Sequence, residues 1–172
     1  MTIAYGARET NDLLARFLES FERRFGYPPG AGENWISGPA ASQDIQAWRS
    51  NGVVDVRRAD ILEFFGEVSE VSLPDVSNGY LIGPPSGVLA DLGGDGPAQV
   101  VGSLQADVLP IGSDGGGGRV AVDLGAKGSV YVLRGGALRD RVYDVDWPIE
   151  IVAANFDSYL ASITNTLLAE LG

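Results

Sequence analysis

Five apolar residues near the amino terminus recur at intervals of three and four positions, which is the spacing of one face of an α-helix. They are Leu14, Phe17, Leu18, Phe21 and Phe25. Asn11 or Thr10 is suited to cap the start of this helix, and Gly26 would end it. The pattern predicts an amphipathic helix from Asn11 to Phe25.

A second apolar stripe with the same spacing lies near the carboxyl terminus. Asn155 precedes the stripe and is suited to cap a helix. We expect this closing helix to lie on the core of the fold rather than to offer a groove to a partner. The stripe consists of Phe156, Tyr159, Leu160, Ile163, Leu167, Leu168 and Leu171.

The segment that follows the first helix has a weaker pattern. Tyr27–Ala41 is rich in glycine and proline and is predicted to be a loop. Ser42 is suited to cap a short helix that runs through Trp48 to Asn51. Residues 54–66 are apolar enough to be buried as a helix or as a strand, and we favour a helix. Residues 1–66 are therefore expected to form a helical lead-in.

The rest of the chain changes to short apolar runs bounded by glycine, which are typical of strands and turns. Leu89–Pro97 is predicted to be a loop because of its glycines. These elements predict an α+β fold in one domain, residues 1–172, with N-terminal helices, a mostly antiparallel sheet, and the closing helix packed on it. Strands are predicted at Tyr80–Ile82, Val100–Gly102, Val108–Ile111, Val142–Val145 and Ile149–Val152, with a hairpin at Val120–Leu133.

Four consecutive glycines, Gly115–Gly118, precede that hairpin. Each glycine costs a helix roughly 1 kcal/mol relative to alanine, but glycine readily adopts a positive φ. We predict a tight turn in which Asp114 is exposed and accepts hydrogen bonds from nearby backbone amides, with contact to a partner as the alternative role. A phosphate-binding loop is excluded because Arg119 and a strand follow the glycines. A calcium loop would need several oxygen ligands, and the turn contains only Asp114.

The glycine segment resembles the signature of the SUKH superfamily. Two outer segments, Leu73–Pro84 and Ala154–Leu160, are similar to the family's Asn-Gly segment and to the start of its closing helix. The resemblance covers about residues 70 to 170, and Tyr80 stands where a second glycine is common. The residues that match the central signature are Ile111, Gly112, Asp114, Gly115, Gly116, Gly117, Asp123, Gly128, Val130 and Tyr131.

This resemblance implies a function without catalysis. The superfamily includes bacterial toxin-immunity proteins and eukaryotic regulators of cell-wall synthesis. The chain is therefore expected to bind and neutralise a cognate protein toxin, often a basic nuclease in this family. A regulatory module with an endogenous partner is the alternative, and a hydrolase built on Asp144 and Asp146 is a third.

Composition narrows the chemistry further. The 172-residue chain has no cysteine and no histidine, which removes disulfides, the commonest metal ligands and the usual general base. We therefore expect no cofactor, no metal and no enzymatic activity. No leader or membrane-spanning run is visible at the sequence level, so a cytoplasmic location is expected. The composition leaves the oligomeric state open.

The charge balance favours a basic protein partner over nucleic acid. Twelve basic residues against 23 acidic residues give a formal net charge of -11. The chain contains no basic residue between Arg58 and Arg119, although acidic residues are frequent there. We predict that some of these acids form a partner-binding face that steers a basic toxin into contact, namely Asp91, Asp95, Asp107 and Asp114.

Overall fold

The computed structural model describes residues 3–52 and 58–172. These residues form five helices and one curled sheet of ten strands. In chain order they are α1 (Ile3–Phe25), β1 (Trp35–Ile36), α2 (Ser42–Ser50), α4 (Ala59–Phe65), β2 (Val71–Leu73), β3 (Tyr80–Ile82), α5 (Pro85–Gly93), β4 (Gln99–Gly102), β5 (Ala106–Ser113), β6 (Arg119–Asp123), β7 (Val130–Leu133), β8 (Ala137–Arg139), β9 (Val142–Val145), β10 (Glu150–Ala153) and α6 (Phe156–Leu171).

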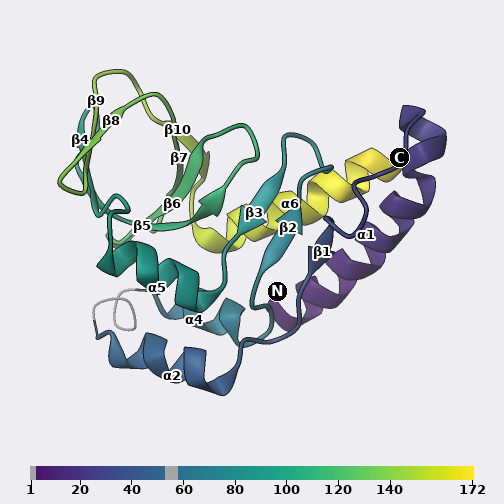
Figure 1. Ribbon diagram of the computed structural model, residues 1–172, viewed down its shortest axis with the longest axis horizontal. Helices are drawn as coiled ribbons and strands as arrows, with labels where there is room; N and C mark the ends of the chain where they lie inside the picture. Colours follow the sequence, from purple (N-terminus) through teal and green to yellow (C-terminus); the bar gives the residue numbers. More distant parts are fainter. Residues whose placement is uncertain (1–2, 53–57) are drawn as a thin grey trace.

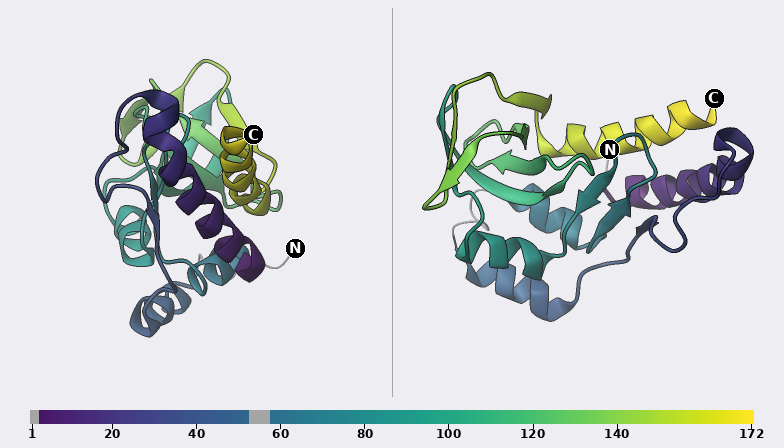
Figure 2. Two further views of the ribbon diagram at one scale, coloured as in Figure 1. Left: turned by 90° about the vertical axis from the view of Figure 1, so that its right-hand side faces the viewer. Right: turned by 45° about the horizontal axis from the view of Figure 1, so that its top comes forward.

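The helices lie on two sides of the curled sheet (Figure 1). The first and last helices, α1 and α6, pack side by side at one end of the molecule (Figure 2). Helices α2, α4 and α5 lie together along another side of the sheet (Figure 1). Strands β4, β8 and β9 form the end of the molecule that lies away from α1 (Figure 1). The predicted α+β class is confirmed, and the described strands pair in antiparallel fashion except for β4 with β9.

The first helix is longer than its apolar pattern predicted. It begins at Ile3 rather than at Asn11, and its predicted cap Thr10 is buried within it. The Thr10 hydroxyl donates to the Gly6 carbonyl at 2.5 Å and lies 2.8 Å from the hydroxyl oxygen of Thr164 in α6. Because the helix and its neighbour satisfy this polar group, a threonine that resembled a cap is accommodated in the interior.

The predicted helices that follow are confirmed where they are described. Helix α2 starts at Ser42, but the predicted cap is wrong, because Ala41 holds the cap position and no side chain caps the helix. Helix α4 shows that the later part of residues 54–66 is helical. Residues 53–57, which include the start of that predicted segment, lie outside the described residues. The predicted loop Tyr27–Ala41 contains the two-residue strand β1, which pairs with β2. A strand this short leaves no apolar periodicity by which sequence analysis would detect it.

The long strand β5 joins two parts of the sheet. One edge of β5 pairs with β6, and the sheet continues through β7 to β10. The other edge is shared, because β4 pairs with the start of β5 and β3 pairs with its end. This divided edge lets the sheet curl, so that β4, β9 and β8 turn away from β3, β2 and β1 (Figure 2).

The central hairpin β6–β7 is covered on both faces. Val130 and Val132 belong to a large core that also contains Phe17, Phe64 and Phe156 of the helices. Tyr131 and Leu133 face a second, smaller core beneath β4 and β9. Every residue of β7 is therefore buried, which explains its continuous apolar sequence.

The prediction of a loop at Leu89–Pro97 is wrong for the first half of that segment. Helix α5 runs from Pro85 to Gly93, with proline at its first position. Its glycines are tolerated because Val88 is buried in the large core and Leu89 and Leu92 pack against that core. Tertiary burial therefore overrides the weak helix preference of this segment.

The predicted closing helix is confirmed as α6. The Ser158 amide donates to the Asn155 side-chain oxygen at 2.8 Å, so Asn155 is the cap. Phe156, Tyr159, Ile163 and Leu167 are buried as expected, because they face the core. The stripe is narrower than predicted, since Leu160 is only half-buried and Leu168 is 46% exposed.

Candidate functional site

The glycine turn between β5 and β6 is built around Asp114. Its carboxylate accepts hydrogen bonds from the Gly116 amide at 3.0 Å and from the Gly118 amide at 2.8 Å. Gly115 and Gly117 have positive φ angles of 70° and 87°, which turn these amides inward. The predicted bonding role of Asp114 is confirmed, but its predicted exposure is wrong. Only 8% of the residue is accessible because the turn closes around the carboxylate.

Arg134 holds the same carboxylate from outside the turn. It forms an ion pair with Asp114 and lies 3.8 Å from a carboxylate oxygen of Glu150. The arginine follows β7 and Glu150 begins β10, so the group joins the glycine turn to the neighbouring strands. The only acid in the glycine turn is thus already paired within the chain.

The Asn-Gly segment and the glycine turn, which both contribute to the resemblance, meet in space. A side chain on Gly115 would overlap the Asn78 carbonyl, and one on Gly79 would come within 3.1 Å of the Gly115 Cα atom. Glycine is therefore required on both sides of this close approach. Tyr80, the departure from the family pattern, hydrogen-bonds instead to Thr166 of α6 at 3.0 Å.

The second part of the signature forms a polar clamp beneath the β6–β7 connection. Asp123 accepts hydrogen bonds from the Gly125 amide at 2.6 Å and from the Tyr131 hydroxyl at 3.1 Å. Arg58, which is 5% exposed, donates to the Asp123 carbonyl at 3.2 Å and pairs with Asp60. A side chain on Gly128 would overlap the Arg58 guanidinium. These signature residues therefore have structural roles.

The tyrosine of this clamp makes the free energy of unfolding depend on pH in the alkaline range. Burial, followed by the nearby Asp123 carboxylate, raises the pKa of the Tyr131 hydroxyl. The unfolded chain loses this proton near its ordinary pKa of about 10, whereas the folded chain retains it, so the free energy of unfolding should fall above about pH 10. Tyr131→Phe should make that fall less steep. Urea denaturation from about pH 8 to about pH 11 would measure the difference, and equal slopes in both proteins would contradict it.

The predicted partner-binding acids lie in different environments. Asp91 of α5 is exposed and forms an ion pair of 3.0 Å with Arg119. Asp95 is exposed in the connection after α5, and Asp107 is exposed near the start of β5, where it accepts a hydrogen bond from Gln99 at 3.1 Å. Asp107 and the buried Asp114 are separated by the length of β5, roughly 20 Å at strand spacing.

The segment between Arg58 and Arg119 contains no basic residue, but arginines from later in the chain contact it in the folded protein. Arg119 pairs with Asp91 and Arg134 with Asp114. Arg141 donates to the carbonyls of Leu92 and Gly96 beside Asp95. Among the four predicted acids, Asp91, Asp95 and Asp107 remain on the surface, and their contact with a partner stays a prediction.

A second surface was not predicted as a site. Trp147 is 50% exposed and Ile151 is 65% exposed, while Ile149 between them packs against the smaller core. The Trp147 ring lies against Gly135, where an added side chain would come within 3.0 Å of it. We call Trp147 and Ile151, with the exposed carboxylates Asp144 and Asp146, the β10 surface. Exposure is the signal that identifies it, and sequence pattern does not reveal exposure.

The residues considered for catalysis or metal binding are dispersed or exposed. Asp144 is exposed on β9, Asp146 follows that strand, and Lys127 is exposed in the β6–β7 connection. Within residues 3–52 and 58–172, no group of carboxylates is arranged to hold a metal ion. None of the helices in these ranges is long and apolar enough to cross a membrane.

Comparison with known proteins adds no relative. No protein-family model matches the chain, and no curated protein matches its sequence.

Proposed function

We propose that this chain is an immunity-type binding protein that captures a basic protein toxin and so neutralises it. The resemblance to the SUKH superfamily supports this function, as does the structural use of its signature. Asp114, Asp123 and Gly128 hold turns and strands together instead of forming a reaction centre. A scaffold of this kind leaves its surface available for recognition.

The β10 surface is the observation that carries the proposal. Protein interfaces are enriched in aromatic anchors and are surrounded by a polar rim. Trp147 and Ile151 provide exposed apolar area on a folded sheet, and Asp144 and Asp146 provide acidic groups close by in the chain. The Trp147 carbonyl accepts a hydrogen bond from Ser103 at 2.7 Å, so the segment is held in place. Such an anchor loses little conformational freedom on binding.

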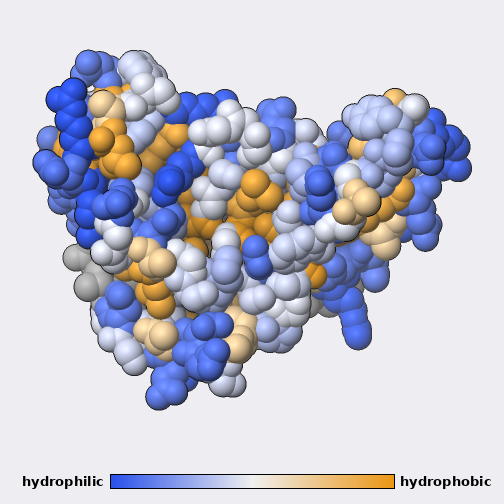
Figure 3. Space-filling view, viewed as in Figure 1, coloured by the Kyte–Doolittle hydropathy of each residue, from blue (hydrophilic) through white to orange (hydrophobic). Residues whose placement is uncertain are grey.

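Charge on this side of the molecule favours a basic partner. Arg134 is shared between Asp114 and Glu150, whereas neither Asp144 nor Asp146 forms an ion pair within the described residues. The whole chain carries a formal net charge of -11. In Figure 3, hydrophilic side chains border apolar ones at the end of the molecule formed by β4, β8 and β9. Exposed carboxylates accelerate encounter with a basic protein, and salt or a basic competitor slows that encounter.

Co-expression with candidate toxins encoded beside this gene tests the function. We expect wild-type protein to restore growth and to co-purify with one of them, and association to slow as salt rises above about 0.1 M. Replacing Trp147 and Ile151 together with alanine should weaken binding by about tenfold or more. Tyr27→Ala is the matched control, because Tyr27 is 57% exposed and lies two residues beyond the end of α1.

The outcomes separate the toxin from the surface. Failure of the wild-type protein to protect against, or bind, every candidate would contradict the immunity function and favour an endogenous partner. Protection that persists without Trp147 and Ile151 would place the interface elsewhere. Asp91→Lys combined with Asp95→Lys then tests the acids first predicted. Asp114 is left unchanged because its substitution would break the glycine turn.

A further inference from the structure

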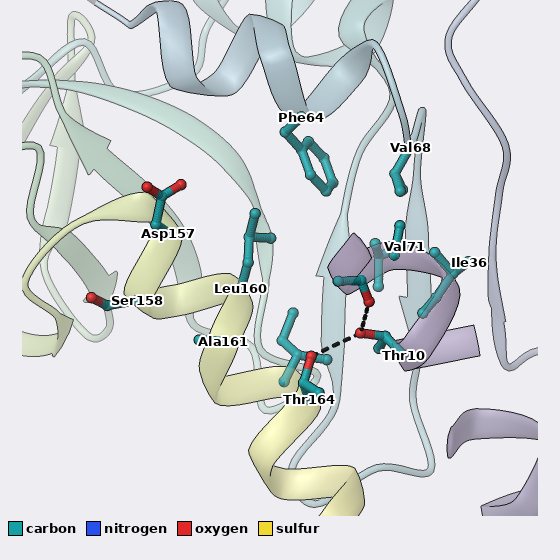
Figure 4. Close-up of a pocket in the computed structure, with 13 residues that line it drawn as sticks. Thr10, Ile36, Phe64, Val68, Val71, Asp157, Ser158, Leu160, Ala161 and Thr164 are labelled. Atoms are coloured by element: carbon teal, nitrogen blue, oxygen red, sulfur yellow. Dashed lines mark hydrogen bonds between the residues drawn. The ribbon is translucent and has the colours of Figure 1, made fainter. Parts of the chain in front are cut away.

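A cavity of about 320 Å³ lies between α1, α4, α6 and strands β1 and β2. Figure 4 shows Phe64 of α4, Ile36 and Val71 of the strands, and Leu160 of α6 around it. Ala7 and Ala161 also line the cavity, and their small side chains leave the space open. Small-molecule sites in proteins are commonly apolar and start at about 300 Å³.

The hydroxyl groups at one end of the cavity have no proton to offer a ligand. Thr10 donates its single hydroxyl proton to the Gly6 carbonyl at 2.5 Å. The contact of 2.8 Å between Thr10 and Thr164 must then use the proton of Thr164 (Figure 4). The remaining capacity of Thr164 is a lone pair, which accepts a hydrogen bond. A ligand that presents only acceptors would find no donor in this pair.

The other end of the cavity carries a negative charge. Asp157 lines the cavity from the first turn of α6 and is exposed, and it forms no ion pair within the described residues. Figure 4 shows its carboxylate on the side of α6 that faces α4. Asp157 and Thr164 are seven positions apart on one helix, which is about 10 Å. Ser158 also lines the cavity beside Asp157. The cavity therefore combines an apolar body with a carboxylate and a hydroxyl at one end and acceptors at the other.

We propose that this cavity binds an amphiphilic amine, whose alkyl chain lies among Phe64, Val71 and Leu160 and whose ammonium group meets Asp157. Burial of the chain supplies most of the affinity, since an exposed ion pair contributes little. The carboxylate supplies selectivity, because it repels an anionic head group and attracts a cationic one. This ligand site is separate from the β10 surface and does not depend on toxin binding.

The test uses three probes of equal chain length with the full-length protein. Calorimetric titration should detect binding of n-octylammonium, weaker binding of 1-octanol, and the weakest binding of n-octanoate. Ala161→Phe fills the cavity and should lower the affinity for n-octylammonium by about tenfold or more. Ala169→Phe is the matched control, because Ala169 is exposed on the same helix outside the cavity and should leave affinity unchanged. Circular dichroism would establish that both variants are folded.

Asp157→Asn tests the charge without filling the cavity. It should weaken n-octylammonium binding about two- to fivefold, as expected for an exposed ion pair, and leave 1-octanol binding unchanged. The proposal is overturned if wild-type protein does not bind n-octylammonium or binds n-octanoate equally well. It is also overturned if Ala161→Phe folds and retains the affinity, or if Asp157→Asn binds both probes as the wild type does.

Discussion

Replacing Gly112 with alanine is expected to destabilise the protein by about 4 kcal/mol or more. An added side chain would overlap the Leu81 carbonyl oxygen and come within 2.7 Å of its carbon atom. Both atoms belong to the backbone of β3, which pairs with β5 at this point through Ile82 and Gly112. A backbone group cannot rotate away as a side chain can. The two strands would therefore have to separate, with loss of their hydrogen bonds and of the packing of Ile82.

Gly93→Ala is the matched control for this substitution. Gly93 is the last residue of α5, and apart from its chain neighbours and the backbone of its own helix no atom lies within 4 Å of an added Cβ atom. This substitution should change the free energy of unfolding by less than about 1 kcal/mol, because alanine has a higher helix propensity than glycine. Urea denaturation of the three proteins would measure the difference. If Gly112→Ala costs no more than Gly93→Ala, the close approach of β3 and β5 is incorrect.

Replacing Phe156 with alanine is expected to cost about 3–5 kcal/mol of stability. Phe156 is fully buried at the start of α6, and its ring meets Phe64 edge-on with centroids 5.4 Å apart. Truncation removes this contact and leaves a cavity where α4, α6 and the sheet converge. The helix would retain its Asn155 cap, so the loss would report packing rather than helix formation.

Two other apolar residues of α6 calibrate this loss. Leu160 was expected from its spacing to be as deeply buried as Phe156, but it is half-buried at the cavity, so Leu160→Ala should cost less. Leu168 is 46% exposed, and Leu168→Ala should cost less than about 1 kcal/mol. Thermal or urea unfolding would rank the three variants. Equal losses at Phe156 and Leu168 would contradict the packing of α6 on the core.

Local patterns in the sequence were sufficient for much of the fold. The spacing of Phe17 and Phe21 predicted the buried face of α1, and Asn155 marked the start of α6. The glycines before Val120 predicted the turn that precedes the central hairpin and joins β5 to β6, including the amide bonds to Asp114. These features depend on interactions between residues close in the chain, so the sequence encodes them directly.

Features that depend on distant partners were predicted less well. Helix α5 exists because Val88 is buried against other elements, and Asp114 is buried because its turn and Arg134 enclose it. The segment that contains no basic residue is contacted by later arginines only when the sheet curls. These are Arg119, Arg134 and Arg141. Spacing along the chain contains no information on these contacts, because separations of 20 residues and more are closed by folding.

The candidate sites were hardest to predict from sequence. Trp147 is an apolar residue that a periodic pattern would assign to a core, and its exposure follows from its place between the end of β9 and the start of β10. The cavity likewise forms because small residues on α1 and α6 face bulky ones on α4 and β2. Exposure and empty volume are properties of the packed whole. A linear sequence specifies which side chains are present, and packing determines which of them a partner or a ligand can reach.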